Sequence, residues 1–156
     1  MEIRVIDGEN AAELKQALGL VRDVFWDFEA PEYSDEGILE FEHYIELESI
    51  AGEMAQNRLL IWGAFVRGRA VGVIAVRPPC HISLFFVEKR YHRKGIGKAL
   101  YGVISDYFRG APGCEAFTVN SSPYAVPVYQ RLGFTETGPE ETVNGIRFIP
   151  MRSELK

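Results

Sequence analysis

The stretch VEKRYHRKGIGKAL, residues 87–100, sets the expectations for the whole chain. It follows an apolar run, CHISLFFV (80–87), and leads into apolar residues at helical spacing, which predicts a turn between a strand and a helix. Gly95 and Gly97 allow a sharp turn with free N–H groups at the helix start, a place that suits a phosphate. Five Lys or Arg residues surround these glycines, although the net charge of the chain is −5. The other reading is a structural turn with solvated basic residues.

Two familiar phosphate-binding motifs do not fit this turn. A P-loop requires Ser or Thr after Gly-Lys, whereas Ala99 follows Lys98. The dinucleotide fingerprint requires a third glycine where Leu100 stands. It also places its glycines directly after the strand, whereas residues 88–94 intervene here. A different kind of phosphate turn is therefore needed.

Acidic and basic residues are segregated along the chain. No Lys or Arg lies between Arg22 and Arg58, but eleven Asp or Glu residues do. This acidic stretch, 23–57, is either a solvated helical face or a lip that attracts a cationic ligand. The basic cluster at 87–100 is local and the isoelectric point is about 5.3, so we expect no nucleic-acid partner.

Length and composition favour one globular domain over residues 1–156. No apolar run has the length of a membrane span, and the alternating N-terminus MEIRVIDGEN does not resemble a signal peptide. Cys80 and Cys114 lack metal-binding spacing. We therefore expect a cytoplasmic protein with no membrane partner, no metal and no disulfide framework.

The hydrophobic pattern predicts a mixed α/β order of elements. The capping pair Asn10 and Glu13 opens a first helix, which APEYS (30–34) interrupts before a second helix at about 38–54. Ser122-Pro123 is a typical helix start. The remaining predicted elements are strands at 2–6, 58–66, 69–77, 80–87, 114–120, 134–137 and 145–151, a hairpin turn at 67–69, and a helix from Gly95 to near Gly110.

Residues 87–100 resemble the acetyl-CoA-binding segment of the GNAT superfamily of N-acetyltransferases, whose signature is [Gln/Arg]-x-x-Gly-x-[Gly/Ala]. Gly95 and Gly97 match that signature, whereas His92 replaces its Gln or Arg. The resemblance implies that backbone amides hold the pyrophosphate of CoA. The cofactor-binding residues that it implies here are Phe86, Val87, His92, Arg93, Lys94, Gly95, Ile96, Gly97 and Lys98.

A second segment, VNSSPYAVPVYQRLGF (119–134), resembles the family pattern N-x-x-A-x-x-Φ-Y-x-x-x-G-F. Tyr129 matches the tyrosine that protonates the departing thiolate, and a phenol with a pKa of about 10 can donate to a thiol near 8.5. The family asparagine aligns with Ser122, while Asn120 lies two positions earlier, so either residue is a candidate for its contact with the cofactor.

The resemblance also implies a fold. It is an α/β fold with a central, mostly antiparallel sheet of about seven strands, splayed between strands 4 and 5 and flanked by about four helices. In this family the pantetheine arm fills the gap like an added strand, next to main-chain atoms that correspond to Phe86 and Val87. Dimers are common in the family, so a homodimer is possible.

The expected function is transfer of the acetyl group of acetyl-CoA directly to a primary amine. Trp26, Phe28 and Tyr33 are interleaved in the acidic stretch, which suits a small cationic acceptor. The alternatives are a non-catalytic CoA-binding sensor or interaction module, or acetylation of a protein lysine or N-terminus. The general base stays open between His81, Glu88, an acid of the N-terminal helices and a water chain.

Overall fold

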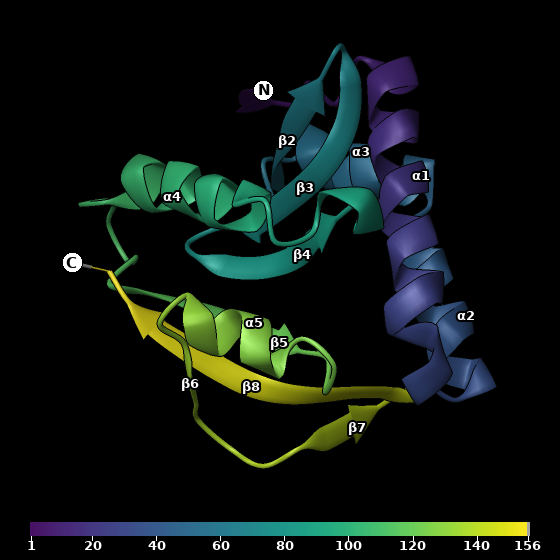
Figure 1. Cartoon of the computed structure of the whole chain (residues 1–156), viewed down its shortest axis with the longest axis vertical. Coiled ribbons are helices and arrows are strands. Elements are labelled where there is room, and N and C mark those ends of the chain that lie inside the picture. Colours follow the sequence, from purple (N-terminus) through teal and green to yellow (C-terminus); the bar gives the residue numbers. More distant parts are fainter. Residues whose placement is uncertain (156) are drawn as a thin grey trace.

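A computed structural model describes residues 1–155 of the chain (Figure 1). Over that range one eight-stranded sheet runs in the order β1-β2-β3-β4-β5-β8-β6, with β7 paired to β8. The strands are β1 (Glu2–Val5), β2 (Leu60–Val66), β3 (Arg69–Arg77), β4 (His81–Val87), β5 (Ala116–Ser121), β6 (Thr135–Glu136), β7 (Glu141–Val143) and β8 (Ile146–Glu154). The α-helices are α1 (Ala11–Phe28), α2 (Asp35–Tyr44), α3 (Leu47–Ala55), α4 (Ile96–Phe108) and α5 (Val126–Arg131).

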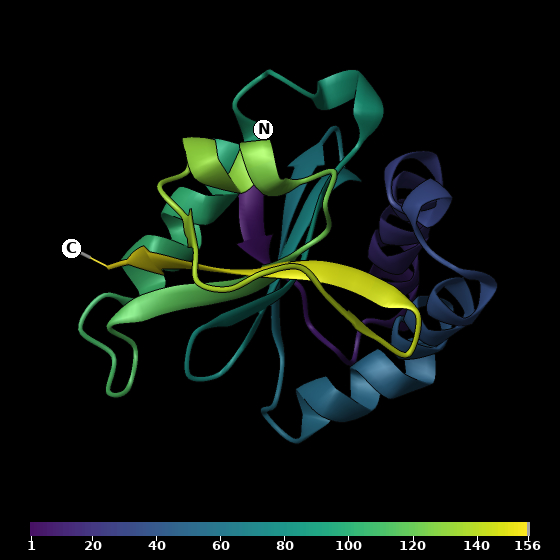
Figure 2. The same cartoon turned by 90° about the horizontal axis from the view of Figure 1, so that it is seen from below.

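The sheet forms the middle layer of the molecule. Figure 2 shows α1, α2 and α3 on one side of it and α4 and α5 on the other. Each side has its own apolar core: Leu14, Val21 and Phe25 of α1 pack on one face, and Leu100 and Ile104 of α4 pack on the other. No helix within residues 1–155 is both long and apolar enough to cross a membrane.

The N-terminal helices begin where their caps predict. The Asn10 side chain accepts a hydrogen bond from the Glu13 N–H at 3.2 Å and so caps α1. The prediction of a single second helix at 38–54 was wrong, because α2 ends at Tyr44, the chain turns at Ile45, and a separate helix, α3, follows. Ile45 and Ile50 are both buried, so the apolar spacing continues across the break and the sequence pattern does not reveal it.

The later elements follow the prediction with two corrections. Residues 67–68, both at positive φ, form the β2–β3 hairpin, and α4 begins after Gly95 as expected. Helix α5 begins at Val126 and not at Ser122-Pro123, because Ser122 forms a separate turn in which its hydroxyl accepts from the Ala125 N–H at 3.2 Å. The closing segment contains one more strand than expected, β7, which forms a hairpin with β8.

The predicted splay between strands 4 and 5 is confirmed. These parallel strands pair only at His81↔Thr118 and Ile82↔Val119. Immediately after this point the pairing of β4 with β3 skips Ser83, which forms a β-bulge. Because the bulge adds one residue, Ile82 packs in the α4 core and Leu84 in the α1 core, although two positions separate them. The strands then diverge (Figure 1).

Candidate active site

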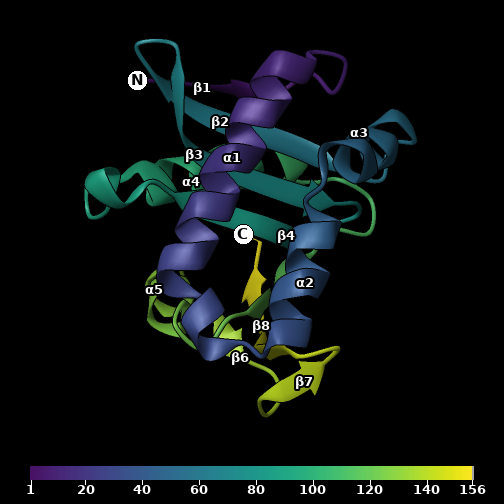
Figure 3. The same cartoon turned by 90° about the vertical axis from the view of Figure 1, so that its right-hand side faces the viewer.

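The gap between the diverging strands holds a cavity of about 730 Å³. Its lining includes residues of α1 and of α5, which lie on opposite faces of the sheet (Figure 2). Figure 3 shows α1 crossing the strands, and Phe28 at its end stacks on Tyr124 of the β5–α5 loop. Most of the residues predicted to bind the cofactor, together with Tyr129, line it. The lining residues are Val24, Phe28, Glu29, Phe85, Phe86, Val87, Tyr91, His92, Arg93, Gly95, Ile96, Gly97, Lys98, Tyr124, Ala125, Val128, Tyr129, Arg131 and Leu132.

The glycine turn forms one wall of this cavity. Gly95 has a φ of 81° and caps α4 with no side-chain hydrogen bond, a conformation that glycine adopts without steric cost. The first helical bond runs from the Ala99 N–H to the Gly95 carbonyl, so the N–H groups of residues 96–98 have no acceptor within the helix. With the side chains of Arg93 and Lys98 beside them, these groups can bind a phosphate. Lys94 does not line the cavity, and its ammonium lies 5.5 Å from the ring centroid of Tyr91.

The open edge of β4 forms the floor. The Glu88 N–H donates to the Val71 carbonyl of the strand pair β3–β4. In an antiparallel pair every second residue forms such bonds, so the N–H and carbonyl groups of Phe85 and Val87 point away from β3, toward the gap. The Nε2–H of His92 donates to the Val87 carbonyl at 2.6 Å and fastens the loop to this edge. Phe86 differs, because its backbone belongs to the β3 ladder. Amide groups of a pantetheine arm fit such an unpaired edge as an added strand would.

Tyr129, in the second sequence motif, packs near the first motif. Its buried ring packs edge-on against Phe85 at 5.9 Å and Phe134 at 5.4 Å. Phe85 also adjoins the backbone of Gly97, so a single aromatic residue connects the tyrosine to the glycine turn. Burial, and then the negative charge of Glu29, raise the pKa of Tyr129 above its ordinary value. The phenol is therefore protonated at neutral pH and can donate a proton.

Glu29 is a cavity residue that the sequence pattern did not single out. It is the C-cap of α1, and the hydroxyl groups of Ser122 and Tyr33 lie near enough to its side chain to lower its pKa. Burial, with a contribution from the charge of Glu32, raises the pKa of Glu29 to about 7. The only sequence signal was membership of the acidic stretch. Glu32 and Tyr33 are close in sequence, but Ser122 comes from a distant segment.

The two residues named as candidate bases lie outside the cavity lining. His81 is at the start of β4, where its Nδ1 is 2.8 Å from the Thr118 hydroxyl. Burial, and then the charge of Arg77, lower the pKa of His81. Burial opposes the ionisation of Glu88, but hydrogen bonds from Arg90 and Arg69 lower its pKa overall.

The two candidates for the family asparagine are in different surroundings. Asn120 is exposed on β5 and pairs with Pro150 of β8, away from the cavity lining. Ser122 is buried, and its hydroxyl reaches Glu29. The structure therefore brings Ser122, and not Asn120, to the acidic end of the cavity.

Contacts between distant segments border the end of the cavity at Tyr124. The Tyr124 N–H donates to Glu32 Oε1 at 3.0 Å, and Arg147 of β8 donates to the Glu32 carbonyl at 3.2 Å. Gly145, in the β7–β8 turn, lies directly against Gly37 of α2, where a side chain on either residue would collide with backbone. These contacts hold the last hairpin against the start of α2.

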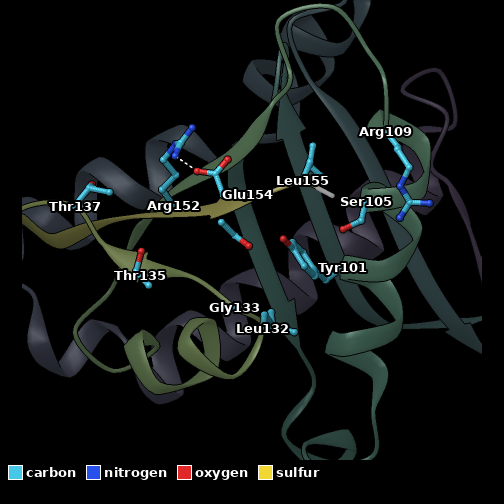
Figure 4. Close-up of a pocket in the computed structure, with 11 residues that line it drawn as sticks. Tyr101, Ser105, Arg109, Leu132, Gly133, Thr135, Thr137, Arg152, Glu154 and Leu155 are labelled. Carbon is cyan, nitrogen blue, oxygen red and sulfur yellow. Dashed lines mark hydrogen bonds and ion pairs between the residues drawn. The ribbon is translucent and has the colours of Figure 1, made fainter.

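A second cavity, of about 570 Å³, lies between the C-terminal half of α4 and strand β8 (Figure 4). Tyr101 and Ser105 of α4, with the C-cap residue Arg109, face the ion pair of Arg152 and Glu154 across it. It contains none of the residues predicted for catalysis or cofactor binding. The chemistry expected from the sequence therefore belongs to the first cavity.

Comparison with known proteins agrees with this geometry. A family model described as an acetyltransferase (GNAT) domain matches residues 29–155. The chain belongs to the GNAT acetyltransferase family. As a member of this family it is an acyltransferase, and the predicted family assignment is confirmed. No curated protein matches the chain.

Solved GNAT structures share the fold along the whole chain. A GCN5-related N-acetyltransferase from Rhodopseudomonas palustris has a TM-score of 0.76 at 20% identity, covering 99% of this chain and 95% of its own. The PaiA N-acetyltransferase from Thermoplasma acidophilum, in complex with coenzyme A, has a TM-score of 0.76 at 19% identity, covering 99% of both chains. An aminoglycoside 6'-N-acetyltransferase from Enterococcus faecium has a TM-score of 0.70 at 16% identity, covering 100% and 98%. At these identities the likeness concerns the fold alone.

Proposed function

We propose that this GNAT chain transfers the acetyl group of acetyl-CoA to the primary amine of a small cationic molecule. The observation that carries the proposal is the continuous cavity that joins the free N–H groups at the start of α4 to Tyr129 and Glu29. A CoA phosphate at the α4 end and a pantetheine arm along β4 would bring the thioester to the level of Tyr129. Both partners of an acyl transfer then meet inside one cavity.

Each wall supplies one requirement of the reaction. The N–H groups of residues 96–98, with Arg93 and Lys98, neutralise phosphate charge. The backbone N–H groups of Phe85 and Val87, which face the gap, can hold the thioester carbonyl and the negative charge that develops on its oxygen. The protonated phenol of Tyr129 can donate to the departing thiolate.

The opposite end of the cavity favours a positively charged acceptor. Glu29 lines it, Glu32 adjoins Glu29, and the rings of Phe28 and Tyr124 stack 5.0 Å apart beside them. Carboxylates attract an ammonium group and aromatic faces stabilise it. The fold shared with an aminoglycoside 6'-N-acetyltransferase supports a small amine as the acceptor.

The contacts that border the acidic end of the cavity favour a small acceptor over a protein segment. The contacts of Glu32 with Tyr124 and Arg147 connect the α1–α2 turn to the β5–α5 loop and to the last hairpin. An extended peptide would need this end to open, whereas a small molecule would not. Acetylation of a protein lysine or N-terminus is therefore the second candidate, and a purely CoA-binding module is the third.

Release of CoA thiol from acetyl-CoA, measured across a panel of polyamines, amino sugars, lysine peptides and neutral amines, tests the proposal. We expect turnover to be highest with small cationic amines. Tyr129→Phe should lower kcat about 10²- to 10³-fold while the Kd for CoA stays unchanged, because only the proton donor is removed. CoA binding without turnover of any amine would favour the binding module, and preference for peptides would favour the second candidate.

A further inference from the structure

We propose that Glu29 is the general base that takes the proton of the acceptor amine, and that Ser122 and Tyr33 hold its carboxylate in position. The inference rests on the proposed N-acetyltransferase function and identifies a catalytic residue that the sequence motifs leave open. Glu29 is the one carboxylate that lines the cavity within residues 1–155. It therefore faces the space that the acceptor must enter.

The end of α1 determines where this carboxylate points. The Glu29 N–H donates to the Phe25 carbonyl at 2.8 Å, and a short 3-10 turn over Ala30–Glu32 then reverses the chain. The side chain is thereby brought across the gap between β4 and β5, to Ser122 just beyond the end of β5. The hydroxyl groups of Ser122 and Tyr33 lie near the carboxylate and lower its pKa. Donation from these hydroxyls would restrict its orientation, which a base acting on a bound amine requires.

The groups around Glu29 tune its proton affinity in opposite directions. Burial is the largest influence and the charge of Glu32 is the second, and both raise the pKa. The hydroxyls of Ser122 and Tyr33 lower it, and the net pKa is about 7. Tyr129 of α5 faces it as a neutral phenol. Of the other polar residues in this region, His92 donates to the Val87 carbonyl and Arg147 forms an ion pair with Glu140, while Arg93, Lys98 and Arg131 line the same cavity. A base with a pKa near 7 is half ionised at neutral pH and suits proton transfer there.

The proton balance connects Glu29 to Tyr129. The acceptor enters as an ammonium, and the Glu29 carboxylate takes one proton from it and later releases this proton to solvent. The neutral amine then attacks the thioester carbonyl, so that the N–C bond forms and the C–S bond breaks. Tyr129 gives its proton to the departing thiolate and regains one from the acylated nitrogen. The products are an amide, a thiol and one released proton.

The experiment measures kcat/KM against pH for the wild-type chain, Glu29→Gln and Ser122→Ala, with the best amine of the panel. We expect the wild-type profile to rise through an apparent pKa near 7. Glu29→Gln should lose this limb and fall about 10²- to 10⁴-fold in kcat/KM. Ser122→Ala should keep turnover but move the limb to higher pH, because a donor to the carboxylate is removed.

Two controls keep the result specific. Glu115→Gln removes an exposed carboxylate just before β5 and should leave the profile unchanged. The Kd for CoA, measured for each variant, reports whether the cofactor side is intact, and it should equal the wild-type value in Glu29→Gln. A second amine with a different pKa shows whether the limb of the pH profile belongs to the enzyme or to the substrate. A limb caused by ionisation of the amine shifts with the pKa of the amine, whereas a limb caused by Glu29 does not.

If Glu29→Gln retained wild-type turnover and the same limb in the pH profile, the role of Glu29 would be refuted, whereas the proposed function would stand. A Ser122→Ala profile that does not move would overturn the positioning role of Ser122. Absence of turnover by the wild-type chain despite CoA binding would refute the proposed function, and with it this inference. Loss of the limb in Glu29→Gln, with the Kd for CoA preserved, supports the inference.

Discussion

The two ends of the cavity differ in charge, in burial and in the way they are built. The cationic wall, residues 92–98, is one continuous segment formed by a loop and the first turn of α4. Its basic side chains are exposed, and the N–H groups of residues 96–98 have no acceptor within the helix. The acidic wall consists of Glu29, which lines the cavity, and the residues that act on it from behind, Glu32, Tyr33 and Ser122, so it is assembled from two separate segments. Its central residue, Glu29, is half-buried, and the hydroxyls of Ser122 and Tyr33 lie near its carboxylate.

This difference indicates two strategies for holding charge. At the cationic wall, water and ligand phosphate can both neutralise the exposed cations, so folding meets little penalty. At the acidic wall, a carboxylate is desolvated next to a second carboxylate, which destabilises its ionised form. We infer that the cationic wall contributes affinity for a phosphate ligand. The acidic wall instead lowers the stability of the fold, and in return the pKa of Glu29 is raised.

The largest expected effect concerns this cost in stability. The pKa of Glu29 is raised in the folded state, so the folded chain binds its proton more tightly than the unfolded chain does. The wild-type stability from this group is full below about pH 4.5 and is lost as the pH rises through about 7. Glu29→Gln should therefore gain up to about 3 kcal/mol relative to wild type between pH 4.5 and 8. Urea unfolding at the two pH values measures the gain, and an equal difference at both would contradict it.

The next effect breaks the cationic wall by steric means. A Cβ at Gly97 would meet Phe85 at 3.5 Å, an ordinary contact, so the longer side chain of Gly97→Leu should extend into the space of the cofactor. We expect the Kd for CoA to rise about 100-fold, or about 2.7 kcal/mol, in isothermal titration. Gly102→Leu on the same helix faces open space and is the matched control. Equal affinity in the two variants would place the cofactor elsewhere.

The smallest effect tests the charge of the same wall. Arg93→Gln with Lys98→Gln should weaken CoA binding about tenfold, or about 1.4 kcal/mol, and should flatten its dependence on salt. The control removes two exposed cations away from the cavity, Lys15 and Arg77. If the double variant and its control showed the same salt dependence, the exposed cations of the wall would not contact phosphate.

Much of the fold could be predicted from local patterns. Asn10 marked the start of α1, the Arg67-Gly68 turn marked a hairpin, and Gly95 marked the start of α4, because each signal is a short-range backbone preference. The break at Ile45 and the late start of α5 were missed. At Ile45 the apolar spacing is compatible with one helix or with two, and at Ser122 a capping residue is compatible with a helix start or with a separate turn. Tertiary packing selects between these alternatives.

The sequence by itself determined the family, the glycine turn and Tyr129, because these depend on residues close together along the chain. Only the tertiary structure decided which carboxylate lines the cavity. Glu32 and Tyr124 are 92 positions apart, and the pKa of Glu29 depends on Ser122 from the same distant segment. Desolvation depends on what surrounds a group in space, and no spacing rule records that. Eleven acidic residues looked alike in the sequence, and the splay of β4 from β5 singled out Glu29.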